Sequence, residues 1–411
     1  MLFRSEWFMH PSGQLPAYEW NFEDVNPPVH AWAAFRVYQM EKRKYGHGDV
    51  DFLEEIFSKM TLYFTWWVNR KGVDGDNLFS GGFLGLDNIA IFDRSNFRVR
   101  NEKGQAAQII QSDGSSWMAM FSLNMLKIAS ELALLCSQSS NPEVQRRQSS
   151  YDAMASKFLQ HFLLIADAMN LIDAKAGGEA TLFDKDDQFY YDILQLPEGV
   201  VVGDGRARSL SMKVRSLVGL IPIFAVEAIP REVLDGALKG DFGKRLTWFR
   251  QHLLNNPDST YVYAAEADGA NLTSRFQGAL LLSLVSPDRL RSLLQRMLDE
   301  DEFLSPHGIR SLSRVHAQPY RLPLTLQSFN GDARRWEQQD EVSIAYAPAE
   351  STSALFGGNS NWRGPVWFPI NYLMIESLQK LHMYLGPDFR VDCPTGDRKS
   401  TRLNSSHTVI S

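Results

Sequence analysis

The sequence predicts an all-α protein in which helical hairpins wrap into an α/α barrel, with their connecting loops gathered over one end. Apolar residues recur at helical spacing in one stretch after another. The strict alternation of apolar and polar residues that marks half-buried strands is scarce. Long connections separate the helical stretches, and ordered loops of such length in compact domains are usually functional. We therefore expect a helical scaffold that carries its chemistry on loops.

The expected helices are placed by their apolar spacing and by residues that begin and end helices. Pro27 and Pro28 suit the first turn of one helix, and Gly46 can end it. Asp113 is expected to cap another. Helices are expected over residues 28–45, 49–70, 115–137, 143–174, 210–226, 231–238, 241–255, 276–284, 287–299 and 368–385. Irregular structure is expected over residues 73–112, 181–202 and 303–361.

Composition and charge argue against several classes of protein. A formal charge of −6 without a basic run argues against a nucleic-acid partner. Two cysteines, Cys136 and Cys393, give neither a disulfide framework nor a metal-binding spacing. No segment is expected to reach the length needed to span a bilayer, and residues 1–10 lack a signal-peptide core. No membrane partner is therefore expected, and the cytoplasm is the default location. Aromatic content is high, with ten Trp, and exposed ring faces often bind sugars.

A glycine-rich stretch around Asp87 is the first candidate for chemistry. Three glycines within residues 81–85 let the backbone approach another group closely. Asp87 itself is flanked by Leu86 and Ile89, and burial among apolar residues favours a protonated carboxyl group. A carboxyl group that keeps its proton near neutral pH can act as a general acid. The alternative is a turn in which Asp87 bonds its own backbone.

Three stretches taken together resemble glycoside hydrolase family 63, which includes processing α-glucosidases and mannosylglycerate or glucosylglycerate hydrolases. They are residues 84–88 (Leu-Gly-Leu-Asp-Asn), 111–117 (Gln-Ser-Asp-Gly-Ser-Ser-Trp) and 359–367 (Asn-Ser-Asn-Trp-Arg-Gly-Pro-Val-Trp). The last is the most specific, and the resemblance extends over about residues 7–396. It implies a six-hairpin (α/α)6 barrel and inverting hydrolysis of an α-linked glucosyl or mannosyl group. It implies no metal or other cofactor.

The resemblance also implies roles for single residues. It makes Asp87 the general acid and places Trp362, Arg363 and Trp367 around the sugar. The chemistry of these side chains suits those roles, because guanidinium offers a planar fork of donors and an indole offers a ring face. Core packing is the alternative for each tryptophan, and a structural ion pair is the alternative for Arg363.

Further residues are predicted to bind the substrate, which is expected to be an oligosaccharide or a small glycoside. Asn88 and Trp117 lie within the matching stretches. Trp20, next to Glu19, could form a wall of the pocket, and Glu350 precedes the Arg363 block. For Glu350 the alternative is an exposed loop acid. Asp113 could contact the sugar or only cap its helix.

An inverting glycosidase needs a second carboxylate, roughly 6.5 to 9.5 Å from the first, to activate water. The resemblance implies a glutamate in a Glu-Tyr context beyond the Trp-Arg-Gly-Pro block. Glu376 follows that block without such a context, so we expect the general base to be missing and this chain to be inactive.

We expect residues 1–396 to be a catalytic domain that is incomplete at both ends. Residues 397–407 match the translation of a widely used sequencing adapter, so residues 397–411 are expected to be a non-native tail. Two rival hypotheses stay open: a related sugar phosphorylase, and a sugar-binding or catalytically degenerate module.

Overall fold

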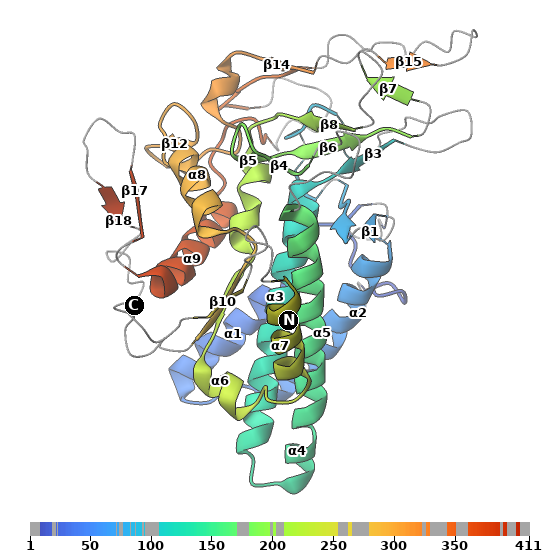
Figure 1. Cartoon of the computed structure of the whole chain (residues 1–411), viewed down its shortest axis with the longest axis vertical. Coiled ribbons are helices and arrows are strands. Elements are labelled where there is room, and N and C mark those ends of the chain that lie inside the picture. The colour runs from blue at the N-terminus through green and yellow to red at the C-terminus, as the bar shows by residue number, and fades with distance from the viewer. Residues whose placement is uncertain are drawn as a thin grey trace.

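The computed structural model describes most of the chain. The described residues are 9–18, 22, 24–70, 72–73, 77–82, 84–86, 88–92, 94, 107–170, 181–197, 200–202, 209–253, 262–264, 279–322, 326–328, 343–350, 361–386, 389–392 and 400–402. Over these ranges long helices form the body of the molecule and the strands are short (Figure 1).

The helices have the following bounds. They are α1 (His30–Tyr45), α2 (Val50–Arg70), α3 (Ser112–Gln138), α4 (Pro142–Arg146), α5 (Gln148–Asn170), α6 (Arg231–Gly236), α7 (Asp241–Leu253), α8 (Pro287–Met297) and α9 (Phe368–Leu385). The 3-10 helices among the described residues are η3 (Leu217–Gly219), η4 (Ile221–Phe224) and η5 (Arg314–Ala317).

The strands pair antiparallel throughout the described residues. Two three-stranded sheets have the orders β3-β6-β8 and β10-β11-β9, and the remaining strands form two-stranded ladders. The strands are β1 (Gly72–Val73), β2 (Leu78–Phe79), β3 (Gln108–Ile110), β4 (Phe183–Asp184), β5 (Phe189–Tyr190), β6 (Asp192–Gln195), β7 (Val200–Val202), β8 (Ser209–Met212), β9 (Val226–Ile229), β10 (Val262–Ala264), β11 (Leu280–Ser283), β12 (Leu304–Ser305), β13 (Gly308–Ile309), β14 (Tyr320–Arg321), β15 (Leu326–Ser328), β16 (Ser343–Ile344), β17 (Arg390–Asp392) and β18 (Ser400–Arg402).

Helix α3 lies at the centre of the molecule. It pairs along its length with α5, and the short α4 closes this hairpin at the bottom of Figure 1. Helices α1 and α2 pack against α3 from another side, and α7 packs against α5. Because neighbours surround α3, nearly all of its residues are buried, and a helix that is apolar all round is typical of such a position.

The apolar character of α3 corrects one expectation about membranes. By length and composition α3 could cross a bilayer, and 78% of its most apolar window is buried inside the protein. The expectation that no segment reaches that length was therefore wrong. A buried core helix passes the same test, so this observation by itself gives weak support for a membrane span.

The helices at both ends of the described chain agree with the sequence. Helix α1 ends before Gly46, whose φ of 81° lies in the left-handed region. Helix α9 has the bounds that its apolar spacing predicts. The long helix expected over 143–174 is instead divided into α4 and α5, and Asn141 caps α4 by accepting the backbone N–H of Glu143.

Three other expectations about secondary structure were wrong. Residues 210–226 form β8, η3 and η4 in place of a helix, since Pro222 cannot donate an α-helical hydrogen bond. Residues 280–283 form β11, which is buried between β10 and β9. A short apolar run fits a buried strand as well as a helix. Residues 181–202 contain β4, β5, β6 and β7, in keeping with the strand preference of aromatic and β-branched residues.

The expected barrel and the expected domain boundaries stay predictions. Helical hairpins are present, with α3 and α5 as the most extensive pair. The short sheet β3-β6-β8 lies beyond one end of this pair (Figure 1). Within the predicted tail, β18 pairs with β17.

Candidate functional site

The side chain of Asn88 joins two of the three stretches that carry the family resemblance. Its carboxamide oxygen accepts the backbone N–H of Trp362 at 2.6 Å, and its nitrogen donates to Oδ1 of Asn361 at 3.2 Å. The backbone carbonyl of Asn88 also accepts Nε–H of Arg363 at 2.8 Å. Asn88 is fully buried. Three hydrogen bonds therefore hold the residue that follows Asp87 against residues 361–363.

The two tryptophans of this block lie face to face. The ring centroids of Trp362 and Trp367 are 4.3 Å apart, with 11° between the planes. Nε1–H of Trp367 donates to the carbonyl of Asn361 at 2.9 Å. Trp362 is 7% exposed, and its indole N–H has no partner among the described residues. One face of Trp367 is thus used for packing, and Trp367 itself is only partly buried.

The guanidinium of Arg363 donates a hydrogen bond from one nitrogen, and its other two nitrogens make none to the described residues. Its Nε–H donates to Asn88, and within the part of the chain that the structure describes it forms no ion pair. Burial lowers the pKa of the guanidinium, and no carboxylate among the described residues counteracts that effect. The predicted alternative of a structural ion pair is therefore not found there. A half-buried guanidinium without a counterion can bind hydroxyl or carboxylate oxygens of a ligand.

The third stretch is tied to the same loop by an amide. The Gln111 side chain accepts the backbone N–H of Gly82 at 2.9 Å and donates to the carbonyl of Gly82 at 2.8 Å. One turn later, the hydroxyl oxygen of Ser115 accepts the backbone N–H of Phe79 at 2.9 Å. The start of α3 thus holds one end of the Asp87 loop and the 361–363 segment holds the other.

The backbone of this loop turns sharply. Gly82 and Gly85 have φ of 71° and 68°, and Leu84 shares the left-handed region with a φ of 51°. A side chain at Gly85 would meet Oδ1 of Asn26 at 3.2 Å. The glycines therefore allow a compact turn that other residues rarely adopt.

The first turn of α3 carries a buried charge cluster. Arg94 donates two hydrogen bonds to the carboxylate of Asp113 and lies 3.4 Å from Asp192. Asp192 accepts the backbone N–H of Ser112 at 2.8 Å. Burial raises the pKa of Asp192 to about 6, and nearby Asp113 adds to the rise, whereas Arg94 opposes it. The cluster anchors residue 94 of the Asp87 loop to α3 and β6.

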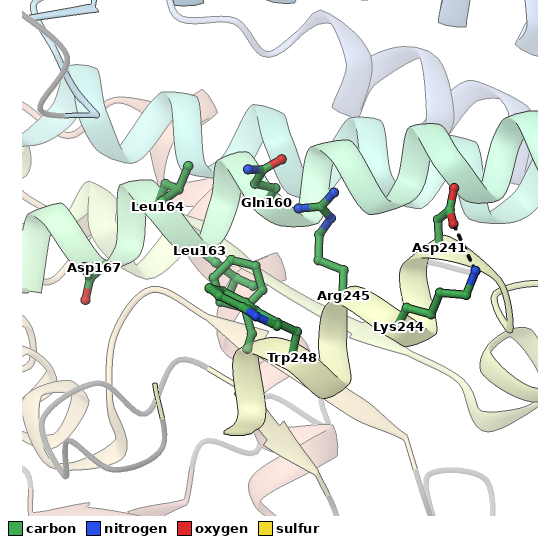
Figure 2. Close-up of a pocket in the computed structure, with 9 residues that line it drawn as sticks. Gln160, Leu163, Leu164, Asp167, Asp241, Lys244, Arg245 and Trp248 are labelled. Carbon is green, nitrogen blue, oxygen red and sulfur yellow. Dashed lines mark ion pairs between the residues drawn. The ribbon is translucent and has the colours of Figure 1, made fainter. Parts of the chain in front are cut away.

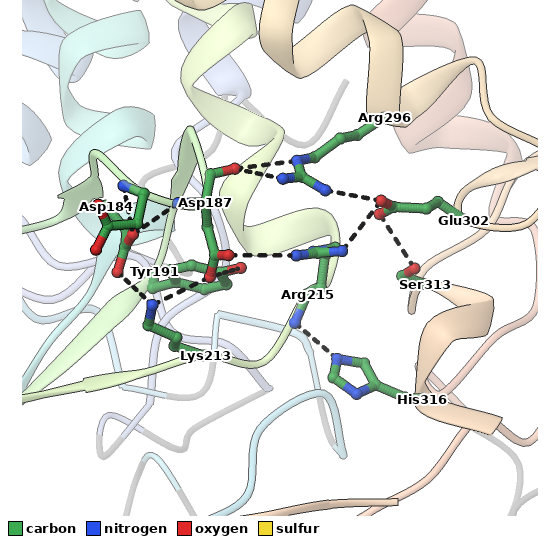
Figure 3. A network of polar contacts seen from close by, with 10 residues as sticks. Asp184, Asp187, Tyr191, Lys213, Arg215, Arg296, Glu302, Ser313 and His316 are labelled. Carbon is green, nitrogen blue, oxygen red and sulfur yellow. Dashed lines mark hydrogen bonds and ion pairs between the residues drawn. The ribbon is translucent and has the colours of Figure 1, made fainter. Parts of the chain in front are cut away.

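Ser311 and a neighbouring polar network hold the backbone that follows Arg363. The hydroxyl oxygen of Ser311 accepts the backbone N–H of Gly364 at 3.1 Å, and the backbone N–H of Ser311 donates to Pro365 at the same distance. Nearby, Figure 3 shows Glu302 accepting hydrogen bonds from Arg215 and Arg296 at 3.0 and 2.8 Å. Ser311 thus holds the backbone at Gly364 and Pro365, and Glu302 holds the neighbouring segment through Ser313.

Gly364 itself needs to be glycine. Its φ of 144° lies in the left-handed region, and a Cβ there would come within 2.7 Å of the Tyr346 ring. This conformation turns the chain between Arg363 and Pro365. The backbone conformation and the close Tyr346 ring therefore explain why this position of the Trp-Arg-Gly-Pro motif is glycine.

The structure reassigns three of the predicted substrate-binding residues. Asp113 is 0% exposed in its ion pair with Arg94. It does not cap α3, because Gln111 occupies the N-cap position. Trp117 is 1% exposed and packs against Phe224 in the core. Asn88 directs its whole side chain to protein partners. Burial leaves these three side chains no surface for a sugar, and their observed contacts are structural.

The remaining predicted residues stay predictions. Asp87, Trp20 and Glu19 lie outside the described residues. Glu350 is exposed on a loop. It follows Ala349, whose carbonyl accepts a hydrogen bond from Asn361, so Glu350 lies beside the Asn88 contacts.

Glu376, the acid that follows the tryptophan block, is held in a different cluster. Its carboxylate accepts Nε1–H of Trp32 at 3.0 Å and lies 3.5 Å from Lys380 and 3.9 Å from Arg36. These contacts tie Glu376 to α1 and to Lys380 of its own helix. No group of three or more His, Cys, Asp or Glu among the described side chains is placed to hold a metal ion.

Sequence reasoning missed several residues that build the site. Asn361 and Gln111 orient the loops through their amides, and Arg94 holds the charge cluster. Asn361 and Gln111 lie inside the matching stretches, so their position could have suggested a role. Nothing in the sequence around Arg94 indicates that it pairs with residues 19 and 98 positions later.

The comparisons with known proteins give a relative but no family. No family model matches the chain. The "Uncharacterized protein YMR196W" of Saccharomyces cerevisiae (strain ATCC 204508 / S288c) is 43% identical over 405 residues. The match covers 96% of this chain and 33% of the yeast protein. The chain therefore spans about a third of the length of the curated relative that it matches.

Three solved structures from Thermus thermophilus resemble the chain weakly. An uncharacterized conserved protein has a TM-score of 0.45 at 11% identity, covering 93% of this chain and 74% of that one. A GH63 mannosylglycerate hydrolase in complex with glucose has 0.42 at 11%, with 93% and 75% covered. The hydrolase in complex with Tris has 0.41 at 12%, with 92% and 74% covered. Because every TM-score is below 0.5, these likenesses carry no argument for this chain.

Proposed function

We propose that the chain carries the sugar-binding and general-acid half of an inverting α-glycosidase acting on a glucosyl or mannosyl substrate. The proposal begins from the resemblance of residues 84–88, 111–117 and 359–367 to glycoside hydrolase family 63. The second and third stretches are far from the first in the sequence, yet hydrogen bonds link both of them to the loop that carries Asp87. A shared site is a reason for such distant segments to meet.

The observation that carries the proposal is the state of Arg363. Its guanidinium is partly buried and fixed at Nε by the carbonyl of Asn88, the residue after Asp87. It has no counterion among the described residues, and burial lowers its pKa. Desolvating a charge without a partner is unfavourable, so such a group is typical of a site completed by a ligand. The planar fork suits paired oxygens such as neighbouring sugar hydroxyls.

The proposed reaction transfers two protons. Asp87 gives its proton to the glycosidic oxygen as the bond between that oxygen and the anomeric carbon breaks. Water attacks the anomeric carbon from the opposite face, and a second carboxylate takes the proton that the water loses. The anomeric configuration inverts because the attack is a single displacement. Trp367 and Arg363 would hold the sugar during this step.

The second carboxylate is the part of the mechanism that the described residues do not supply. Glu376 is held by Trp32 and Lys380, and Glu350 is exposed. This observation favours the sugar-binding module as the second candidate function. In that case the chain would hold a sugar at Arg363 without hydrolysing it.

Measurements of sugar binding and of hydrolysis distinguish the glycosidase from the sugar-binding module. Isothermal titration of this chain with α-glucosides and α-mannosides should give measurable binding that Arg363→Lys weakens by roughly tenfold, because lysine keeps the charge but loses the fork. Arg231→Lys, at an exposed position on α6, serves as the matched control and should bind as the wild type does. Unchanged affinity in Arg363→Lys would remove the basis of the proposal.

Turnover is measured on the full-length product of the gene. Release of the sugar with inverted configuration, followed by NMR, is expected in the wild type and should be abolished by Asp87→Asn while binding persists. Undiminished hydrolysis by Asp87→Asn would refute the role of Asp87. Binding without hydrolysis in the wild type would select the sugar-binding module, and release of a sugar phosphate only when phosphate is added would select a phosphorylase.

A further inference from the structure

A large groove lies apart from the Asn88 contacts, between α5 and α7. Its volume is about 760 Å³, within the usual range for small-molecule sites of roughly 300 to 1,000 Å³. Leu163 of α5 and Phe249 of α7 form the buried apolar floor. None of the described residues that line it is among the predicted site residues. Figure 2 shows the groove with both helices.

The most prominent group in the groove is Trp248. Its side chain is 53% exposed although it is large and aromatic, and its ring meets Phe249 edge to face, with centroids 5.0 Å apart. The edge contact orients the indole, and the exposed half of the side chain can stack on a flat apolar surface. The C–H face of a sugar ring is such a surface, and tryptophan combines a ring face with a polar N–H.

Hydrogen-bonding groups stand around this ring. Arg245 of α7 reaches across to α5, where its Nε–H donates to the Ser156 hydroxyl at 2.7 Å, as its direction in Figure 2 indicates. That bond fixes the guanidinium and leaves its terminal nitrogens for a ligand. Gln160 and Asp167 of α5 line the same groove. Within the described part of the chain, neither side chain makes a hydrogen bond or an ion pair.

Charge favours a neutral ligand. The lining holds two acids, Asp167 and Asp241, and two bases, Lys244 and Arg245. Asp241 and Lys244 lie 3.6 Å apart, so they balance each other at one end. Burial raises the pKa of Asp167, and no cation counteracts that rise. The oxygens of Asp167 can accept hydrogen bonds from the hydroxyl groups of a ligand.

We propose that the α5–α7 groove is a second saccharide-binding site, which holds a neutral α-glucan chain through stacking on Trp248 and hydrogen bonds from Gln160, Asp167 and Arg245. The α-glucan class rests on the proposed function, whereas the preference for a neutral polyhydroxyl ligand rests on the groove alone. The site is separate from the Arg363 contacts and would hold a substrate chain rather than cleave it.

The test is cross-linking with a photoreactive maltohexaose, followed by peptide mapping and by titration calorimetry. Cross-links are expected in peptides from residues 160–167 and 241–249. Trp248→Ala should weaken binding at this site by roughly tenfold or more, because the stacking surface is lost. The far-ultraviolet circular dichroism should stay unchanged, since the ring is half exposed.

Two matched variants sharpen the test. Tyr45→Ala removes a similarly exposed aromatic ring, 58% exposed on α1, and should leave the cross-link yield unchanged. Asp167→Asn keeps a hydrogen-bonding group and should change affinity only a few-fold, whereas Asp167→Leu should reduce it about as much as Trp248→Ala.

Three outcomes would overturn the proposal. They are the absence of cross-links in these two peptides, equal affinity of the wild type and Trp248→Ala, and a self-associating chain whose dimer, rather than sugar binding, is lost in Trp248→Ala. The failure of this proposal and the failure of the proposed function are distinguishable. Trp248-dependent binding can persist when the full-length protein hydrolyses nothing, and hydrolysis can persist when Trp248 is replaced.

Discussion

The carboxamide of Asn88 binds the backbone N–H of Trp362 across 274 residues of sequence. The same side chain donates to Asn361, and the carbonyl of Asn88 accepts a hydrogen bond from Arg363. The relative position of the Asp87 loop and the tryptophan block therefore depends on one fully buried amide. A buried polar group whose hydrogen bonds are satisfied specifies a unique geometry.

Asn88→Ala should destabilise the protein by about 2 to 4 kcal/mol, because the backbone N–H of Trp362 and the Asn361 side chain both lose a buried partner. Chemical denaturation would measure this loss, and amide hydrogen exchange at Trp362 should become faster. Asn124→Ala is the matched control, since Asn124 is also buried but its amide nitrogen has no partner among the described residues. Equal losses in the two variants would show that packing rather than hydrogen bonding holds the loop.

Arg94→Leu should cost about 3 to 5 kcal/mol at pH 7, because it leaves Asp113 and Asp192 buried without a cation. Burial already raises the pKa of Asp192 to about 6. An aspartate whose pKa is higher in the folded than in the unfolded protein stabilises the fold at pH values below its unfolded pKa, which is near 3.9. This contribution to the free energy of unfolding is lost as the pH rises through 6. Without Arg94 the pKa of Asp192 should rise further, so the deficit of the variant should grow between pH 4 and pH 7.

Urea denaturation across that pH range would test the Arg94 prediction. Arg291→Leu is the control, because Arg291 pairs with Asp288 on the surface of α8, where the side chains are 47% and 95% exposed. An exposed pair of this kind contributes about 0 to 1 kcal/mol. A deficit in Arg94→Leu that is the same at pH 4 and pH 7 would contradict the assignment of the titrating group.

Glu227→Gln should destabilise the protein at neutral pH and have little effect in acid. Burial acts to raise the pKa of Glu227, but Lys127 and Lys380 outweigh it and lower the pKa to about 2. A lowered carboxyl pKa contributes stability above the unfolded value near 4.3, which is lost as the pH falls toward 2. The difference from the wild type should be about 3 kcal/mol at pH 7.

Thermal unfolding between pH 2.5 and 7 would follow the loss of the Glu227 contribution. Glu55→Gln provides the comparison, since Glu55 pairs with Lys59 on the surface of α2 with 42% of its side chain exposed. That variant should change the free energy of unfolding by about 0.5 kcal/mol or less. A pH-independent effect of Glu227→Gln would mean that its role is steric.

His316→Asn should flatten the dependence of stability on pH between 4 and 6.5. Nε2 of His316 accepts the backbone N–H of Arg215 at 2.8 Å (Figure 3). Burial lowers the pKa of this imidazole to about 4, and the nearby charge of Arg215 acts in the same direction. The neutral ring thus contributes stability above pH 6.5 that is lost as the pH falls toward 4.

In this pH range the wild type takes up about one proton at His316 when it unfolds, and the variant does not. The slope of the unfolding free energy against pH should therefore decrease by the amount that corresponds to about one proton. His307→Asn, at an exposed position, should keep the wild-type slope. An unchanged slope in His316→Asn would assign the acid sensitivity to other buried groups, such as His161, whose pKa burial also lowers to about 4.

Much of the helical framework could be predicted from the sequence. The bounds of α1, α2 and α9 are close to those expected from apolar spacing, and Gly46 ends α1 as expected. The buried face of α1 differs from the expected one, because Val37 and Met40 are exposed whereas Phe35 and Tyr38 are buried. The same reasoning failed for Leu280–Ser283, because a short, mostly apolar run fits a buried strand as well as a helix. It also failed at Pro222, where a continuous apolar run hid a break in the helix.

The candidate site could likewise be predicted only in part. The Trp-Arg-Gly-Pro block and the glycine-rich loop could be singled out because their residue types are unusual and lie together in the chain. Which side chains face a ligand could not be predicted. Trp117 and Trp367 are both tryptophans in matching stretches, yet Trp117 lies in the core and Trp367 is only partly buried.

By itself, the sequence determined the local structure: the period of each helix, the turns at its glycines and the stretches that resemble a glycosidase. The tertiary structure alone decided which of those stretches meet, since the contacts of Asn88 with Trp362 and of Arg94 with Asp113 and Asp192 join residues whose neighbours in the sequence give no sign of them. The physical reason is that burial sets the role of a polar side chain. An amide or carboxylate that loses water must find a partner in three dimensions, and that partner depends on how the helices pack rather than on the residues beside it.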